Sequence, residues 1–230
     1  MATPTLIYCG GGNATFADIA IAAGFEYGAQ LPDDKVYREP LYFADQNWKR
    51  ADRVGYVAAV RTYRPHVASV LDWEHEDQLP EVLSWAEDVA PWCAVVMIIP
   101  KVQGGVSRIP RMIGGKSVRL GYSVPTKHGG TSLMVSEFQG WPVHLLGGSP
   151  HEQVKIYRYL PGVVSVDGNM AMKMAVRFGA FYDFWYRGGK RTHWPTLSGV
   201  DGARWVGNAP AEALRRSLNG IKALWRSVDV

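Results

Sequence analysis

The chain has 230 residues, of which 47% are hydrophobic and 20% charged, and its formal net charge is +4. This composition is typical of one globular domain with a substantial core, and so small a charge permits a polyanionic partner without requiring one. Two cysteines, far apart in the sequence, exclude a disulfide framework or a cysteine-rich zinc site, and no apolar run is long enough to cross a bilayer.

The first residues, MATPTLIYCGGG, lack the basic region, apolar core and cleavage site of a secretory signal. We therefore expect a cytoplasmic protein, in a compartment that keeps thiols reduced, with no membrane partner. The six histidines show no spacing typical of a metal site, such as His-x-x-x-His, so the sequence predicts no metal.

Eight apolar, β-branched segments are spaced along the chain and are typical of strands. In chain order they are residues 5–12, 25–32, 40–46, 67–75, 93–102, 117–125, 142–150 and 162–169. Helical patterns lie between several of them, at residues 13–24, 49–64, 79–90 and 151–160, with weaker helical patterns at 109–115 and 131–140.

Continuous apolar strands that alternate with helices indicate a parallel sheet covered by helices. Eight such units favour a compact, closed (β/α)8 barrel of the TIM type, expected over roughly residues 5–185. A Gly-rich basic loop and one amphipathic helix, roughly 209–227, follow it. We predict a single β/α-barrel domain over residues 1–230, with a basic C-terminal extension over 186–230.

Three aspartates occupy matching positions, at the carboxyl ends of the expected strands. Asp45 ends the third strand, Asp72 the fourth and Asp167 the eighth. A β/α barrel carries its reactive groups at this end, which we call the mouth. Each aspartate alone is explained equally well as a helix cap or a turn residue, and the pair Asp167-Gly168 is a strong turn signal. Their coincidence at one mouth favours a functional site.

Two carboxylates across a small pocket can carry out a displacement at a sugar carbon, one as nucleophile and the other as general acid and base. A nucleobase is a suitable leaving group here. Gln103 can pair with an amide-like base edge, Asp72 can accept from N–H donors, and Gly121 would let a base approach the backbone. Four aromatic side chains could stack on the base: Tyr42, Trp48, Trp73 and Tyr122. Aromatic residues of a barrel nevertheless usually belong to its core.

Two further features of the sequence are typical of phosphate-binding sites. Gly147 and Gly148 follow the seventh strand and precede a helix, an arrangement that commonly cradles a phosphate group. Basic residues gather near the C-terminus; a solvated helix face explains them, but on a nucleic-acid hypothesis they are the first candidates for phosphate contacts. These candidates are Arg187, Lys190, Arg191, Arg215, Arg216 and Lys222.

The order and spacing of these motifs resemble the tRNA-guanine transglycosylases, and more closely their DNA-directed relatives, which insert 7-deazaguanine bases in phage and bacterial DNA modification. FADQNW, VLDWEH, IPKVQGG, LLGGSPHEQV and SVDGNM carry the resemblance, within residues 5 to 185. It implies that Asp167 is the nucleophile and Asp45 the general acid and base. It also implies that Asp72, Gln103 and Gly121 line the base pocket. We further predict as substrate-binding residues Trp48, Gly104, Tyr122, Gly147 and Gly148.

The tRNA enzymes carry a Cys/His zinc site after the barrel and an Arg-rich segment after the nucleophile, and this chain has neither. The resemblance therefore implies DNA, rather than tRNA, as the partner. The implied activity replaces guanine in DNA with a purine or 7-deazapurine base, through a covalent Asp-glycosyl intermediate and without a cofactor.

Three alternatives stay open at this point. Water could resolve the intermediate, giving a nucleoside hydrolase or DNA glycosylase with the same two acids. The barrel could instead bind the phosphate of a small metabolite, or bind a purine or nucleic acid without turnover. The sequence predicts neither the oligomeric state nor the identity of the bases.

Overall fold

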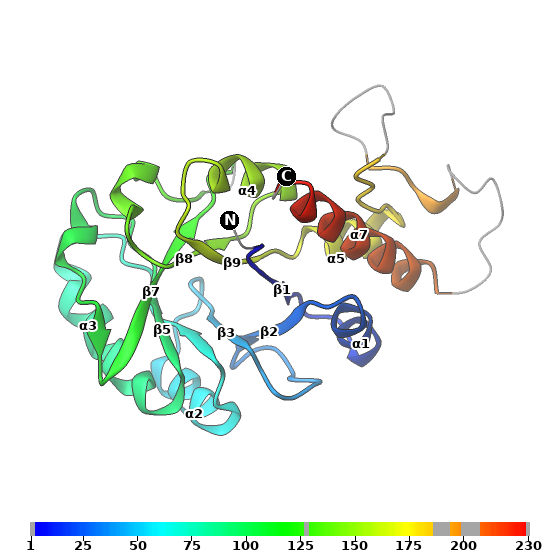
Figure 1. Cartoon of the computed structure of the whole chain (residues 1–230). Helices are drawn as coiled ribbons and strands as arrows, with labels where there is room; N and C mark the ends of the chain where they lie inside the picture. Colours follow the sequence, from blue (N-terminus) through cyan, green and yellow to red (C-terminus); the bar gives the residue numbers. More distant parts are fainter. Residues whose placement is uncertain (1–2, 127–128, 186–193, 199–207, 229–230) are drawn as a thin grey trace.

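The computed structural model describes residues 3–126, 129–185, 194–198 and 208–228. Eight parallel strands form a closed barrel (Figure 1). They are β1 (Thr5–Cys9), β2 (Glu26–Leu31), β3 (Phe43–Gln46), β4 (Val67–Ser69), β5 (Val95–Ile98), β7 (Lys116–Ser123), β8 (Val143–Leu146) and β9 (Val163–Asp167). β5 pairs with β7, and β9 pairs with β1, which closes the ring. The eight strands and the TIM-type barrel expected from the sequence are confirmed.

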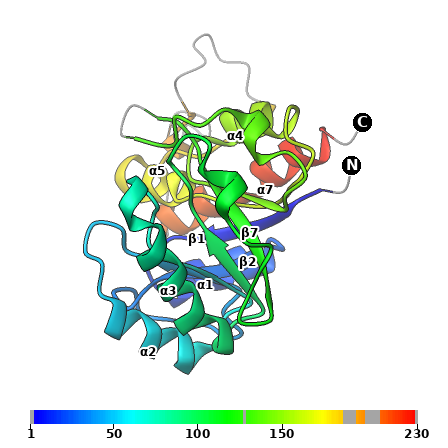
Figure 2. The ribbon, with the colours of Figure 1, turned by 90° about the vertical axis from the view of Figure 1, so that its left-hand side faces the viewer.

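Helices cover the outside of this barrel. They are α1 (Ala14–Ala22), α2 (Arg53–Tyr63), α3 (Leu79–Val89), α4 (Pro150–Tyr157), α5 (Met170–Phe178) and α7 (Ala209–Arg226), with short 3-10 turns η1 (Glu76–Gln78), η2 (Ala90–Trp92), η3 (Gly105–Arg108) and η4 (Val135–Phe138). α2 and α3 lie side by side on one flank (Figure 2). On another flank, α7 packs against α1, α4 and α5. Within the described ranges, each helix is too short or too polar to span a membrane.

The expected helices at 13–24, 49–64, 79–90, 151–160 and 209–227 are confirmed as α1, α2, α3, α4 and α7. Several of them begin after a side chain that accepts a backbone N–H bond, as helix starts favour: Asn13, Asp52, Ser149 and Asn208.

Two weaker helix predictions are corrected. Residues 109–115 contain a short strand, β6 (Met112–Ile113), which pairs antiparallel with the start of β7. Gly114 and Gly115 make the tight turn between them with φ of +54° and +74°, where a side chain would be strained. Residues 131–140 form only the single turn η4.

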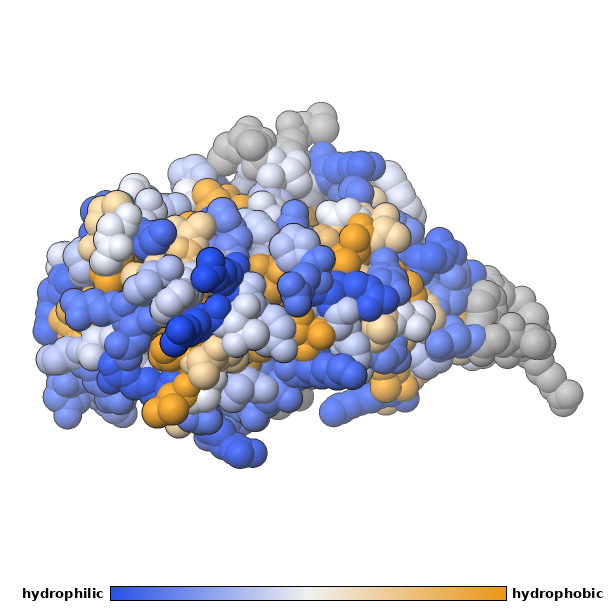
Figure 3. Space-filling view, turned by 90° about the horizontal axis from the view of Figure 1, so that it is seen from below, coloured by the Kyte–Doolittle hydropathy of each residue, from blue (hydrophilic) through white to orange (hydrophobic). Residues whose placement is uncertain are grey.

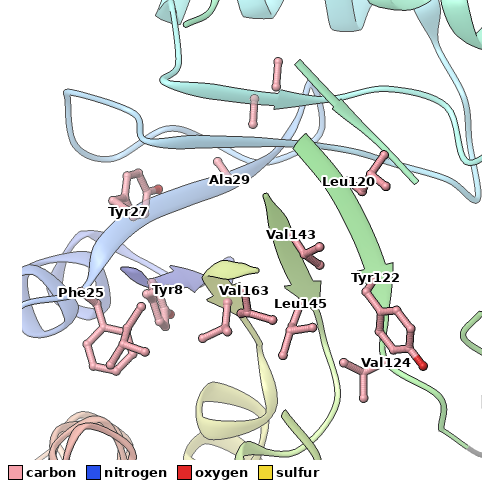
Figure 4. Close-up of a cluster of buried hydrophobic side chains, with 14 of the residues drawn as sticks. Tyr8, Phe25, Tyr27, Ala29, Leu120, Tyr122, Val124, Val143, Leu145 and Val163 are labelled. Atoms are coloured by element: carbon pink, nitrogen blue, oxygen red, sulfur yellow. The ribbon is translucent and has the colours of Figure 1, made fainter. Parts of the chain in front are cut away.

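Side chains alternate along each strand, so that one set fills the barrel and the other meets the helices. Ile7, Cys9, Phe43, Val67 and Met97 form a separate buried cluster inside the barrel. The larger core lies between strands and helices, and Figure 4 shows part of it, with Tyr8, Leu145 and Val163 directed from the strands toward the helices. Figure 3 shows an outer face on which hydrophobic residues are interrupted by hydrophilic ones.

Candidate functional site

Asp45 and Asp167 both lie at the mouth of the barrel, at the carboxyl ends of β3 and β9. Asp45 follows Phe43 by two residues on β3 and Asp167 follows Ser165 by two on β9, so strand alternation directs both carboxylates inward. Burial raises the pKa of Asp45 most, and the negative charge of Asp167 is the next cause. The structure thus places the two acids that the sequence predicts as catalytic at the same end of the barrel, with both side chains directed inward.

Asp167 is held from one side. Its Oδ1 accepts a hydrogen bond from the backbone N–H of Gly147 at 3.0 Å and lies 3.3 Å from Nε2 of His144. Gln153 links the ends of β8 and β9. Its Nε2 donates to the carbonyl oxygens of Gly147 at 2.7 Å and of Asp167 at 2.6 Å. The Asp167 side chain remains 11% exposed, so the carboxylate is fixed but still accessible.

Asp45 lies in a different environment. Its Oδ1 accepts a hydrogen bond from Ser69 Oγ at 3.2 Å, and Ser69 in turn accepts from the backbone N–H of Gln46 at 2.8 Å. Burial, followed by the charges of Asp167 and Asp72, raises the pKa of Asp45 to about 8, although hydrogen bonds from Ser69 and Gln30 oppose the shift. Asp45 therefore holds its proton at neutral pH and can donate it.

Asp72 lies beyond the end of β4 and is engaged in an ion pair. Nζ of Lys101 lies 2.7 Å from Asp72 Oδ2 and 2.7 Å from Glu74 Oε1. Burial raises the pKa of Asp72, and its hydrogen bond and charge interaction with Lys101 act against this. Trp48 is next to this pair, 56% exposed, with Lys101 Nζ 5.9 Å from its ring centroid. Asp72 and Trp48 thus form one rim of the mouth.

Other residues expected in the pocket have different surroundings. Gln103 is exposed, and the N–H of Gly104 donates to Glu137 Oε2 at 2.9 Å. A Cβ on Gly121 would come within 2.7 Å of side-chain atoms of both Ile99 and Leu146, so this glycine is closely packed in the barrel wall. Tyr122 is buried against Phe138 in the outer core. Trp73 and Tyr42 also pack within the protein, Trp73 fully buried and Tyr42 stacked on His66.

The basic residues expected to contact phosphate fall into two groups. Arg187, Lys190 and Arg191 lie outside the described residues. On α7, Arg215 and Arg216 both bind Glu212, and Lys222 Nζ donates to the carbonyl oxygen of Ala23 at 2.8 Å. Arg215 and Arg216 therefore pair within α7, and Lys222 links the helix to Ala23 at the end of α1; their contacts with phosphate stay a prediction.

Sequence reasoning missed a polar chain inside the barrel. His144 Nδ1 lies 2.7 Å from Ser165 Oγ, which also accepts a hydrogen bond from Arg119 Nη1 at 3.0 Å. His144 and Ser165 are fully buried, and burial lowers the pKa of His144. Their signal in the sequence is a polar residue at an inward position of an otherwise apolar strand. That signal becomes readable only once the strand register is known.

Two further features bear on what the site could bind. In the ranges that the structure describes, no three His, Cys, Asp or Glu side chains are grouped so as to hold a metal ion. A cavity lies on the outer side of the barrel wall, between β1, β9 and the helices α4, α5 and α7. Its lining is mainly apolar and includes Leu6, Tyr8, Val166, Leu218 and Ile221. The lining also includes Gly148, Asp167 and Gly168, so the cavity reaches the loops at the mouth.

Together, the fold and the site define a β/α-barrel protein with two carboxylates in different environments at its mouth. The chain belongs to the family of unknown function DUF6610, whose model matches residues 18–226. Asp45, Asp72, His144 and Asp167 all lie within the matched range. A search of curated proteins finds no significant match.

Proposed function

We propose that this protein is a base-exchanging N-glycosyl transferase that replaces guanine in DNA with a 7-deazaguanine-type base. One observation carries the proposal. Asp167 accepts N–H donors that favour a carboxylate, whereas burial and charge keep the proton on Asp45, with a pKa of about 8. A nucleophile and an acid at one mouth are what a double displacement at a sugar carbon requires.

In the first step, Asp167 attacks C1′ of the flipped-out nucleotide and the bond from C1′ to the base breaks. The bonding electron pair leaves with the base, which takes the proton from Asp45. In the second step, the Asp45 carboxylate removes a proton from the incoming base, which attacks C1′ and displaces Asp167. Both carboxyl groups then regain their starting protonation states.

The small-metabolite alternative has less support. A phosphate cradle after β8 needs free N–H donors, but Gly147 donates to Asp167 and Ser149 caps α4 by accepting from Glu152. The carboxylate of Asp167 would also repel a phosphate at this position. The geometry therefore favours a sugar carbon, rather than a phosphate, as the group next to Gly147.

Two observations support DNA as the partner. The net charge of the chain is positive, and the chain lacks the zinc-binding cysteines of the tRNA enzymes that it otherwise resembles. We place the activity in the cytoplasm, because Cys9 and Cys93 are both free and buried.

The test is covalent trapping on a denaturing gel. Wild-type protein and the Asp167→Asn variant are incubated with single-stranded DNA, double-stranded DNA or tRNA, each with and without a 7-deazaguanine base. We expect a shifted band with DNA in the wild type and none in Asp167→Asn. Asp77→Asn, which changes an exposed acid on η1, serves as the matched control and should behave as wild type.

A labelled base separates exchange from hydrolysis. Incorporation of the label into DNA supports exchange, whereas abasic DNA without incorporation supports a glycosylase. A band with tRNA alone would overturn the choice of DNA, and a band that persists in Asp167→Asn would overturn the role of Asp167.

A further inference from the structure

The polar chain beneath Asp167 is built from three neighbouring strands. Arg119 comes from β7, His144 from β8 and Ser165 from β9. A register shift at Val143/His144 pairs His144 directly with Ser165, which brings the imidazole and the hydroxyl together inside the barrel. The chain ends at Oδ1 of Asp167.

The hydrogen bonds in this chain allow one arrangement of protons that satisfies every partner. Arg119 Nη1 is always a donor, so it donates to Ser165 Oγ. The Ser165 hydroxyl can then donate its own proton to Nδ1 of His144, 2.7 Å away. With Nδ1 acting as an acceptor, the ring proton of a neutral His144 lies on Nε2, facing Asp167.

The other two states of His144 are unfavourable. In the opposite tautomer the lone pair of Nε2 would face the Asp167 carboxylate at 3.3 Å, and two acceptors would repel each other. A protonated imidazole is disfavoured mainly by burial and further by the positive charge of Arg119; the hydrogen bond and charge of Asp167 act in the opposite direction but leave the pKa of His144 lowered. Both considerations leave the neutral ring with its proton on Nε2.

We propose that His144 is a positioning residue for Asp167: held in the Nε2–H tautomer by Ser165 and Arg119, it donates to Oδ1 and presents Oδ2 as the attacking atom. The role of Oδ2 rests on the proposed function. Gly147 N–H and His144 Nε2 both address Oδ1, and among the described residues none donates to Oδ2. The attacking atom therefore keeps its electron pairs free while its partner oxygen is fixed.

The direct test reads the tautomer and needs no substrate. Long-range ¹H–¹⁵N correlation spectra of histidine-labelled wild-type protein distinguish the two neutral tautomers and the imidazolium, and loss of one signal set in His144→Gln assigns His144. We expect the Nε2–H tautomer at neutral pH. Either the Nδ1–H tautomer or the imidazolium would overturn the inference. Ser165→Ala should destroy the tautomer preference, whereas Ser165→Thr, which keeps the hydroxyl, should preserve it.

The second test measures the rate of adduct formation and the affinity for DNA. His144→Phe keeps a ring but has no donor, and we expect the rate to fall about 10- to 100-fold, the effect of losing a hydrogen bond to a charged group. His144→Gln retains an N–H donor and should restore most of the rate, with DNA affinity unchanged in both variants. A wild-type rate in His144→Phe would overturn the positioning role. If the wild type forms no adduct at all while the spectra show the Nε2–H tautomer, the proposed function fails and the hydrogen bond to Asp167 stands.

Discussion

At the scale of single residues, the two mouth aspartates differ because their neighbours differ. Asp167 faces N–H donors, whereas Asp45 is enclosed and has the charges of Asp167 and Asp72 nearby. The sequence predicts both acids, because each ends an apolar strand. It does not predict their protonation states, which depend on Ser69, Gly147 and the distances between strands.

The raised pKa of Asp45 has a consequence for stability. Because the folded protein holds this proton more tightly than the unfolded chain does, the free energy of unfolding should fall as pH rises from about 4, the ordinary pKa of an aspartate, to about 8. Asp45→Asn cannot ionise and escapes this loss. We expect the variant to be more stable than wild type at pH 8, by on the order of 1–3 kcal/mol, and the difference to shrink below pH 5.

Urea unfolding of both proteins at pH 5 and pH 8 measures this difference, with Asp77→Asn as the control for loss of a surface charge. A stability difference that is the same at both pH values would show that Asp45 is ionised in the folded protein. The proposed acid role would then fail.

At the scale of elements, prediction from sequence succeeds where the pattern of apolar residues is strong and fails where that pattern is weak. The strands are continuous apolar runs, and α7 has a clear apolar stripe. The helix α5 is not predicted from the sequence. It spans only nine residues, and its buried face consists of the small residues Ala171 and Ala175, while Met170, Val176 and Phe178 stay exposed.

The helix α7 has a buried face and an exposed basic face. Trp225 is fully buried against Tyr157, whereas Arg215, for which the sequence predicts a phosphate contact, pairs with Glu212 on the same helix. We expect Trp225→Ala to lower the free energy of unfolding by about 3–5 kcal/mol, the cost of emptying a buried aromatic site. Arg215→Ala, at a side chain that is 54% exposed, should cost less than about 1 kcal/mol.

Urea denaturation of the two variants gives both values. Equal, small losses would mean that α7 is not part of the folded core. A loss of DNA affinity in Arg215→Ala without a loss of stability would support the predicted phosphate contact of this helix.

At the scale of the whole molecule, the barrel brings together residues that are far apart in the chain. Eight strands in alternation with helices suffice to predict this closure, and closure directs Asp45 and Asp167 into one mouth. Arg119, His144 and Ser165 could not be predicted as a group, because their contact depends on the register of three strands and on the shift at Val143/His144.

The central claim is that Asp167 becomes covalently bound to the sugar, and peptide mass spectrometry of the trapped adduct tests it most directly. Trypsin cleavage after Arg158 and Lys173 yields the peptide YLPGVVSVDGNMAMK, in which Asp167 is the sole acidic residue. We predict that the mass of a nucleotide lacking its base is added to this peptide and to Asp167 within it. The same added mass on the peptide EPLYFADQNWK, which contains Asp45, would contradict the assignment of nucleophile and acid.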